Sequence, residues 1–250
     1  APPAGWTDHY VYANGIRIHY WRAPNPGKPV MVFAHGSSDD GLCWTNFARE
    51  FASDYDLYLV DARGHGLTDP PKPGDPADVQ AEDLAAFIRE LKLSRPVVVG
   101  HSMGSAAAAW FAAKYPDVPR AVVLEDPWLG GRRTAPDGPP PEERIRRMIE
   151  RNNMTLEQLA AECMKNSPKW GESECAYWAP SKRRHHPATA LISIGARPPM
   201  SELFPRITAP TLILKADAPE ETRKESAATA ALLAKGKLVH ITGAGHNVRR

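Results

Sequence analysis

A serine flanked by glycines is the feature of this sequence that most directly suggests chemistry. Residues 100–104 read Gly-His-Ser-Met-Gly, between Arg-Pro-Val-Val-Val at 95–99 and an Ala-rich run at 105–113. This order predicts a buried strand, a sharp turn and a helix, with the hydroxyl of Ser102 raised above the sheet and the glycines leaving room that a Cβ would fill. We therefore predict that Ser102 is a nucleophile, with an ordinary Gly-flanked turn as the alternative.

Strand and helix patterns alternate around this turn. Residues 9–13 and 16–21 alternate about Asn14-Gly15, a favoured hairpin dipeptide. Further strands are expected where short apolar runs end at turns, at 30–34, 57–60, 95–99, 121–124, 211–214 and 237–241. Helices are expected at about 77–93, 105–113 and 220–234. The alternation predicts an α/β fold with a mostly parallel sheet flanked by helices.

One long segment, at 128–205, interrupts the alternation of strands and helices. It contains Pro- and Gly-rich turns and no convincing strand, with amphipathic helical segments at about 141–152, 155–165 and 187–196. A helical insertion between two core strands is a cap, and ligands bind where the carboxyl ends of strands meet such a cover. We therefore divide the chain into a first core part at 1–127, a helical cap insertion at 128–205 and a second core part at 206–250.

Composition and charge narrow the class of protein. The 250 residues carry a net charge of +2, which argues against nucleic acid as a partner, and no apolar run approaches the roughly 20 residues that span a bilayer. The 3 cysteines lack Cys-x-x-Cys or zinc spacing, so we expect reduced thiols and no metal site. The first residues lack the basic and hydrophobic regions of a signal peptide. We expect a soluble, cytoplasmic protein that does not bind membranes.

Four motifs, in this order along the chain, resemble the α/β-hydrolase family. They are His-Gly-Ser-Ser at 35–38, Asp-Ala-Arg-Gly-His-Gly at 61–66, the serine motif at 100–104, and Gly-Ala-Gly-His at 243–246. The likeness covers nearly the whole chain and implies the α/β-hydrolase fold with a helical cap, in the branch that uses a serine nucleophile. Family members usually continue into a final helix, whereas this sequence ends at Arg250.

The resemblance also implies roles for the residues near Ser102. His246 occupies the place of the general base, which takes the serine proton during attack. The amides of Ser37 and Met103 would form the oxyanion hole. For the triad acid we favour Asp126, which ends the strand after the serine, where haloalkane-dehalogenase-like members carry theirs. The alternative acid is Asp217, at the commoner location but in a turn without the usual glycine; more remote candidates are Glu125 and Glu220.

Other polar and aromatic residues have two interpretations each. Ser38, Asp39 and Trp44 are candidates to line the substrate site from the core. An aromatic wall over the acyl group is one role for the cap aromatics, and cap-to-core packing is the other; these residues are Trp128, Trp170, Tyr177 and Trp178. A cluster of arginines is interpreted as a solvated helix face, with the alternative that one of them holds a substrate carboxylate; it comprises Arg144, Arg146, Arg147 and Arg151.

The Asp-Ala-Arg-Gly-His-Gly motif at 61–66 and four further histidines are expected to be structural or exposed. Asp61, Arg63 and His65 are predicted to hold their own loop, and His240 lies within a predicted strand. Three other histidines are expected at the surface, namely His9, His185 and His186.

A serine at the motif's centre disfavours haloalkane dehalogenase and epoxide hydrolase chemistry, because family members with those activities attack through Asp. The sequence has no dinucleotide fingerprint and no metal cluster, so no cofactor is expected. We expect a serine hydrolase that cleaves a carboxylic ester or lactone of a small to medium hydrophobic substrate through an acyl-enzyme. The alternatives are hydrolysis of a carbon–carbon bond in a diketone by the same residues, or a non-catalytic ligand receptor on the same fold.

Overall fold

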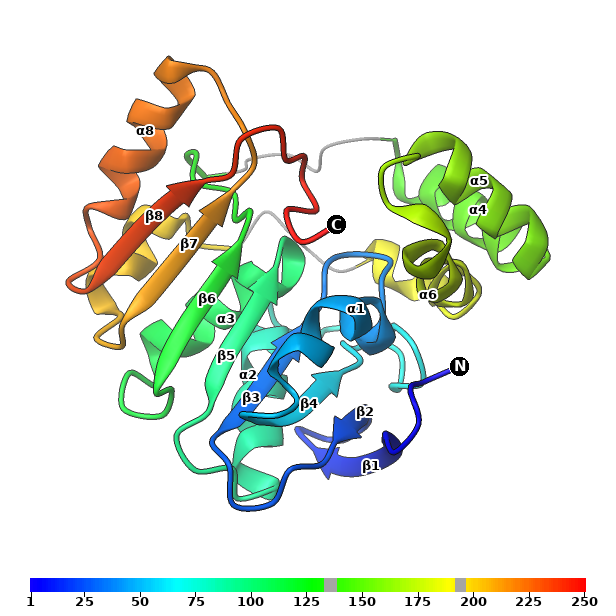
Figure 1. The fold of residues 1–250 in the computed structure, drawn as a ribbon, viewed down its shortest axis with the longest axis horizontal. Helices are drawn as coiled ribbons and strands as arrows, with labels where there is room; N and C mark the ends of the chain where they lie inside the picture. The colour runs from blue at the N-terminus through cyan, green and yellow to red at the C-terminus, as the bar shows by residue number, and fades with distance from the viewer. Residues whose placement is uncertain (133–138, 192–196) are drawn as a thin grey trace.

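The computed structural model describes residues 1–132, 139–191 and 197–250, and its centre is one eight-stranded sheet. The strand order is β1-β2-β4-β3-β5-β6-β7-β8 (Figure 1). The pairs β1–β2 and β2–β4 are antiparallel, and every other neighbouring pair is parallel. The predicted mostly parallel α/β sheet is therefore confirmed. The strands are β1 (Thr7–Ala13), β2 (Ile16–Ala23), β3 (Val30–Ala34), β4 (Asp56–Val60), β5 (Val97–His101), β6 (Ala121–Glu125), β7 (Thr211–Lys215) and β8 (Gly236–His240).

Alternate side chains of the central strands build two apolar layers. Val32 and Val98 belong to one buried cluster, together with α2 (Val79–Glu90) and the Ala-rich α3 (Met103–Lys114). The neighbours Phe33 and Val99 belong to a second cluster on the opposite face, which includes Trp44. Short helix α1 (Thr45–Ala48) covers this second face, so the sheet is enclosed between α1 in front and α2 and α3 behind (Figure 1). Helices α7 (Met200–Leu203) and α8 (Glu220–Ala230) complete the core.

Strand β5 begins later than the sequence suggests. The expected run starts at residue 95, but Arg95 has φ 43° and Pro96 has no amide to donate to the ladder, so β5 begins at Val97. The strand continues through His101, which pairs with Glu125 of β6. This register brings the end of β5, and the serine after it, level with the end of β6.

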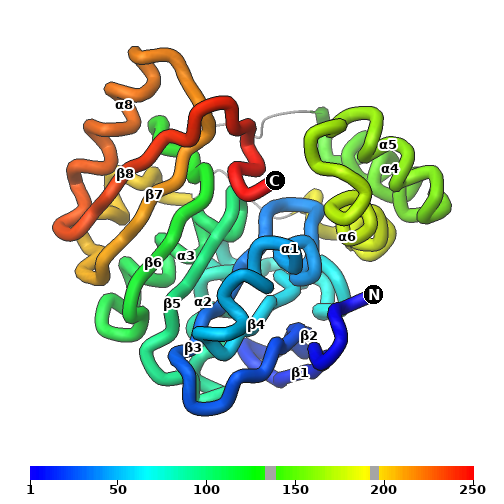
Figure 2. Tube along the Cα trace, viewed as in Figure 1, coloured from blue at the N-terminus to red at the C-terminus, as the bar shows by residue number. Residues whose placement is uncertain are grey.

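Helix α7 falls within the predicted insertion but packs against α3 of the core, and the limits at 128–205 stay a prediction. Three other helices of the described residues occupy the insertion. They are α4 (Pro141–Asn152), α5 (Leu156–Asn166) and α6 (Gly171–Arg183), and they lie together beside the carboxyl end of the sheet (Figures 1 and 2). Helix α6 was not expected, because Pro180 in its interior is a residue that normally ends a helix. The segment predicted as helical at 187–196 starts with a 3₁₀ turn (Pro187–Leu191), and its remainder falls outside the described residues.

Buried ion pairs attach helix α6 to the loop after β3. The Lys182 ammonium donates to Asp39 Oδ1 at 2.8 Å and to the Ser38 carbonyl at 2.6 Å, with both charged side chains almost fully buried. Arg184 pairs with Asp40 at 2.9 Å. Arg250, after β8, bridges Asp39 and Glu174 of α6. Removing one partner of a buried pair strands the other charge, so these contacts fix the position of α6 on the core.

The structure corrects the prediction for the cysteines. Cys163 of α5 and Cys175 of α6 form a disulfide with a Cα–Cα distance of 5.6 Å, and Cys43 is a buried free thiol. The sequence hid this pair because spacing alone does not reveal which residues of two helices face each other. Disulfides persist in oxidising compartments, so the cysteines no longer favour a cytoplasmic location. Within the described residues, no helix is both long and apolar enough to cross a membrane.

Thiol counting tests this pairing directly. Of the 3 cysteines, we expect one to react with a thiol reagent in the unfolded, non-reduced protein and all to react after reduction. Unfolding is required because burial raises the pKa of the Cys43 thiol to about 12 and leaves it unreactive in the folded chain. Full reactivity without a reducing agent would contradict the disulfide.

Candidate active site

The serine predicted as nucleophile sits in a strained turn between β5 and α3. Ser102 has φ 50° and ψ −110°, a conformation that an L-residue adopts only when its surroundings impose it. Two glycines permit the turn, because a Cβ on Gly100 would lie 2.3 Å from the Gly104 carbonyl oxygen, and one on Gly104 would lie 2.1 Å from that of Ala34. The Ser105 hydroxyl donates to the Ser102 carbonyl at 2.6 Å and holds the turn from the helix side.

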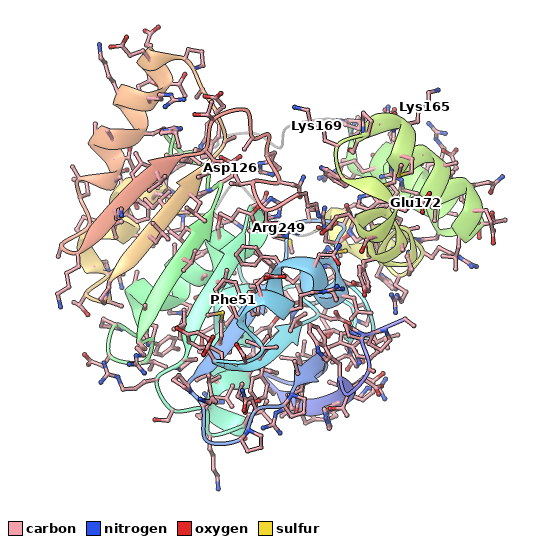
Figure 3. All side chains as sticks on the ribbon, in the orientation of Figure 1. Phe51, Asp126, Lys165, Lys169, Glu172 and Arg249 are labelled. Carbon is pink, nitrogen blue, oxygen red and sulfur yellow. A yellow bond between two sulfur atoms is a disulfide. The ribbon has the colours of Figure 1, made fainter. Side chains whose placement is uncertain are left out.

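A hydrogen-bonded chain runs from this serine through a histidine to a carboxylate. His246 Nε2 lies 2.9 Å from Ser102 Oγ, and His246 Nδ1 lies 2.6 Å from Asp126 Oδ2. Three elements supply the residues: the turn after β5, the end of β6 and the segment after β8, which turns back across the sheet (Figure 2). Asp126 lies at the upper end of β6 in Figure 3. With a proton on Nδ1 shared with the carboxylate, Nε2 is free to accept the serine proton.

The second oxygen of Asp126 has its own donors. Lys215 at the end of β7 lies 2.6 Å from Oδ1, and the amide of Ala216 donates to it at 3.1 Å. Burial favours the neutral acid, but hydrogen bonds from His246 and Lys215 outweigh it and lower the pKa of Asp126 to about 2. Asp126 is therefore ionised at neutral pH, as a carboxylate that orients an imidazole must be. The sequence analysis did not single out Lys215, since a lysine at a strand end carries no motif.

The alternative acids are engaged elsewhere. Asp217 is exposed, accepts from the Gly243 amide at 2.8 Å and pairs with Arg223. These hydrogen bonds lower the pKa of Asp217 and hold the turn rather than the imidazole. Glu125 is buried against Arg249, at 2.7 Å, and Glu220 pairs with Lys224 at 2.9 Å. The geometry thus brings Asp126, the favoured candidate, against His246.

His101, the last residue of β5, holds the loop that carries His246. Its Nε2 lies 3.0 Å from the His246 carbonyl oxygen, and the two rings are 4.8 Å apart. Burial, followed by the nearby charge of Arg249, lowers the pKa of His101 to about 3, so the neutral ring donates from Nε2. Gly36 makes this possible, because a Cβ there would lie 2.4 Å from His101 Nδ1. The second position of the serine motif, which His101 occupies, carries no sequence signal for this role.

A cavity of about 540 Å³ opens onto Ser102. Ser37, Met103 and Trp128 line it, and all three are among the residues that the sequence analysis proposed for the site. Met103 is the first residue of α3, where backbone amides have no partner within the helix, so its amide is available to an oxyanion. The described lining comprises Ser37, His65, Gln80, Ser102, Met103, Ala106, Asp126, Pro127, Trp128, Gly131, Arg132, Arg144, Met148, His185, Thr189, Ala190, Arg197, Pro198, Pro199, Met200, Lys215 and His246.

Three candidates from the core do not line this cavity. Trp44 is 1% exposed, and its ring lies 5.2 Å from that of Phe33 and 4.0 Å from the guanidinium carbon of Arg249. Ser38 binds Lys182 through both its carbonyl and its hydroxyl, and Asp39 pairs with the same lysine. The predictions of Trp44 and Ser38 as substrate contacts are therefore corrected. Ser38 and Asp39 attach helix α6 to the core through Lys182, whereas Trp44 packs within the core.

The other cap aromatics also pack between elements. Trp170 lies 4.5 Å from the guanidinium carbon of Arg250, and Trp178 lies 4.7 Å from the Lys182 ammonium. The Tyr177 carbonyl accepts a weak hydrogen bond from the Cys43 thiol. The contacts of Trp170 and Tyr177 fit cap-to-core packing, one of the two interpretations of the sequence, whereas Trp178 and Lys182 belong to the same helix.

His65 and His185 also line the cavity, which the sequence analysis did not predict. His185 was predicted at the surface but is 7% exposed, and its ring stacks on that of His65 at 4.5 Å. Burial, followed by neighbouring positive charge, lowers the pKa of His185 to about 4, and burial also lowers that of His65. Both rings are therefore neutral at pH 7. Asp61 and Arg63 do hold their own loop, through Gly41 and Asp83.

Comparison with known proteins identifies the family of this chain. The model of the alpha/beta hydrolase family matches residues 31–249. The chain belongs to the alpha/beta hydrolase family. Its eight-stranded sheet, with a helical segment between β6 and β7, is the α/β-hydrolase fold with a helical cap. Among the described residues, no group of three or more acidic, histidine or cysteine side chains could hold a metal ion.

Curated relatives in this family have several hydrolytic activities. The chain is 35% identical over 129 residues to N-formylmaleamate deformylase of Pseudomonas putida, covering 50% of this chain and 48% of that protein. It is 38% identical over 98 residues to 2-(acetamidomethylene)succinate hydrolase of Mesorhizobium japonicum, covering 39% and 35%. It is also 33% identical over 116 residues to epoxide hydrolase 1 of Caenorhabditis elegans, covering 46% and 29%. The matches thus span less than half of each relative's length.

Solved structures show the same fold over nearly the whole chain. The N-formylmaleamic acid deformylase of Pseudomonas putida S16 superposes with a TM-score of 0.78 at 24% identity, covering 97% of this chain and 95% of that one. The enol-lactonase of Burkholderia xenovorans superposes with a TM-score of 0.71 at 20% identity, covering 95% and 92%. At these identities the likeness establishes the architecture of this hydrolase and leaves its substrate open.

Proposed function

We propose that this alpha/beta hydrolase cleaves a carboxylic ester or lactone of a small to medium hydrophobic substrate through an acyl-enzyme on Ser102. The observation that carries the proposal is the hydrogen-bonded chain Ser102–His246–Asp126, with distances of 2.9 and 2.6 Å. This geometry supplies a nucleophile, a base and an orienting carboxylate in one line. It opens directly onto the cavity in which a substrate would bind.

The proposed reaction has two steps. In the first, Ser102 Oγ attacks the carbonyl carbon while His246 Nε2 takes the serine proton, and the carbonyl oxygen becomes an oxyanion beside the amides of Met103 and Ser37. Collapse of this intermediate breaks the bond to the leaving oxygen, which takes the proton from His246. In the second step water attacks the acyl-enzyme and gives a proton to His246. Collapse then breaks the bond to Ser102 Oγ, which takes that proton back from His246, and the acid is released.

The residue at the nucleophile position separates this proposal from epoxide hydrolysis. Several relatives are epoxide hydrolases, a chemistry that family resemblance assigns to an Asp nucleophile. This chain has Ser102 there, and its nearest strand-end carboxylate, Asp126, is already bound to His246 and Lys215. A serine alkoxide attacks an acyl carbon, which supports ester or lactone cleavage. Carbon–carbon hydrolysis of a diketone would use the same residues and remains the alternative enzymatic activity.

A panel of 4-nitrophenyl esters tests the proposal. We expect turnover to peak at a short to medium acyl length, because a cavity of about 540 Å³ admits only a limited chain. A burst of 4-nitrophenol, one equivalent per enzyme, is expected when deacylation is slower than acylation. Mass spectrometry should then place the acyl group on the peptide that contains Ser102.

A parallel assay with a vinylogous diketone distinguishes the alternatives. Cleavage of the diketone without turnover of any ester or lactone would favour the carbon–carbon hydrolase. Binding of small acids or esters without any turnover would instead favour a receptor.

A further inference from the structure

The cavity beside Ser102 has an excess of positive charge. Among the described residues that line it, Asp126 is the one carboxylate. The cationic side chains of the same lining are Arg132, Arg144, Arg197 and Lys215. Asp126 is matched by Lys215, at 2.6 Å, and Arg132 is paired outside the lining with Glu202, at 2.8 Å. Among the described residues, Arg144 of this lining has no carboxylate partner, so its charge can attract an anionic ligand.

Arg144 of α4 is the side chain best placed to use this charge. One terminal nitrogen donates to the Ala190 carbonyl at 2.6 Å, which anchors the guanidinium against the 3₁₀ turn at 187–191. Its Nε is shielded from solvent and has no hydrogen-bond partner among the described residues. Burying a donor without an acceptor raises the free energy of the folded state. Among the described residues, the Arg144 guanidinium as a whole also has no anionic partner. A carboxylate in the cavity, placed against the Arg144 side chain that lines it, would supply this anionic partner.

Other arginines on the same helix behave differently. Arg146 is exposed and pairs with Glu150 one turn away, and Arg147 is exposed and pairs with Glu143. These two form the solvated, self-paired helix face expected from the sequence. Arg144 departs from that pattern because it points into the cavity.

The remaining lining indicates a partly apolar ligand. Met148 follows Arg144 by one helical turn, and Met200 and Ala106 contribute further apolar surface. His65 and His185 are neutral because burial lowers their pKa, so they add hydrogen-bonding capacity without charge. Such a cavity accommodates an apolar segment with an anionic group at the end that meets Arg144.

We propose that the substrate carries a carboxylate, that Arg144 binds this carboxylate, and that the ester or lactone carbonyl lies at Ser102. The assignment of the reacting end rests on the proposed function, whereas the carboxylate subsite does not. A planar guanidinium binds a carboxylate through charge-assisted hydrogen bonds with a fixed geometry. The subsite would therefore select half-esters or lactones of dicarboxylic acids over neutral esters and would fix which carbonyl reaches the serine.

Calorimetric titration with glutarate and adipate tests the subsite without any chemistry. We expect one of these diacids to bind the wild-type protein, and Arg144→Met to weaken its Kd by about tenfold or more. The matched control is Arg146→Met, on the exposed face of the same helix, which should leave the Kd unchanged. Binding that is equally strong in Arg144→Met, or no binding of either diacid to the wild type, would overturn the proposal.

A second arm measures selectivity between monoethyl adipate and diethyl adipate. We expect the ratio of their kcat/KM values to favour the monoester in the wild type and to fall by about tenfold or more in Arg144→Met. An unchanged ratio would count against Arg144. Failure of all proteins to cleave either ester would contradict the proposed function and would leave the diacid titration to decide the subsite.

Discussion

Ester hydrolysis by Ser102→Ala should be lower than that of the wild type by about four orders of magnitude or more in kcat. The substitution removes the Oγ that lies 2.9 Å from His246 Nε2, and with it the atom that forms the acyl-enzyme. A methyl group fits where the hydroxyl was, so the fold should persist. Labelling with a fluorophosphonate, which reacts with activated serines, should be seen in the wild type and be absent in this variant.

Ser105→Ala is the matched control for this experiment. Ser105 lies one helical turn after Ser102, is fully buried, and uses its hydroxyl to bind the Ser102 carbonyl. We expect this variant to be labelled and to keep measurable turnover. Robust labelling of Ser102→Ala, or loss of labelling only in Ser105→Ala, would remove Ser102 from the mechanism.

Asp126→Asn should lower kcat by about a hundredfold or more. The carboxylate accepts the proton of His246 Nδ1 at 2.6 Å and stabilises the imidazolium formed during attack. An asparagine keeps the shape but removes the charge, and its amide can donate to Nδ1. That arrangement places the proton on Nε2, which then cannot accept one from Ser102. Steady-state kinetics on an activated ester, with circular dichroism to check the fold, measure the effect.

Asp217→Asn serves as the control, with a decrease of less than about tenfold expected. Asp217 is exposed and binds the Gly243 amide and Arg223, so its charge does not reach the imidazole directly. The reverse ranking of the two variants would mean that the acid follows β7 and that Asp126 only holds the turn at the end of β6.

The α/β core follows from local sequence because each of its elements has a strong, short-range pattern. β-branched runs such as 97–99 can be buried on both faces only in a covered parallel sheet, and Gly100 and Gly104 are required wherever a strand meets a helix this closely. The apolar face of α2 and the Ala-rich α3 likewise identify helices that pack on a sheet. These signals are local, so a single sequence reveals them.

The cap helices could be predicted less well from the sequence than the core, for a physical reason. Its helices carry few buried apolar residues, with none in α4, and they attach to the core largely through ion pairs such as Lys182–Asp39. Ion pairs and the disulfide Cys163–Cys175 join residues far apart or on different helices, and leave no periodic pattern. Helix α6, His185 and the cysteine pair were therefore misjudged from the sequence.

The sequence by itself determined the type of residue available for chemistry and the strand ends that carry it. Ser102, His246 and two competing carboxylates could be named from motifs and their order. Only the tertiary structure showed which of Asp126 and Asp217 lies against His246, because both follow strands and the sequence does not reveal which one reaches His246 Nδ1. It also decided that Arg144 faces the cavity while Arg146 faces solvent, since a long side chain near the edge of a helix face can turn either way until its neighbours are in place.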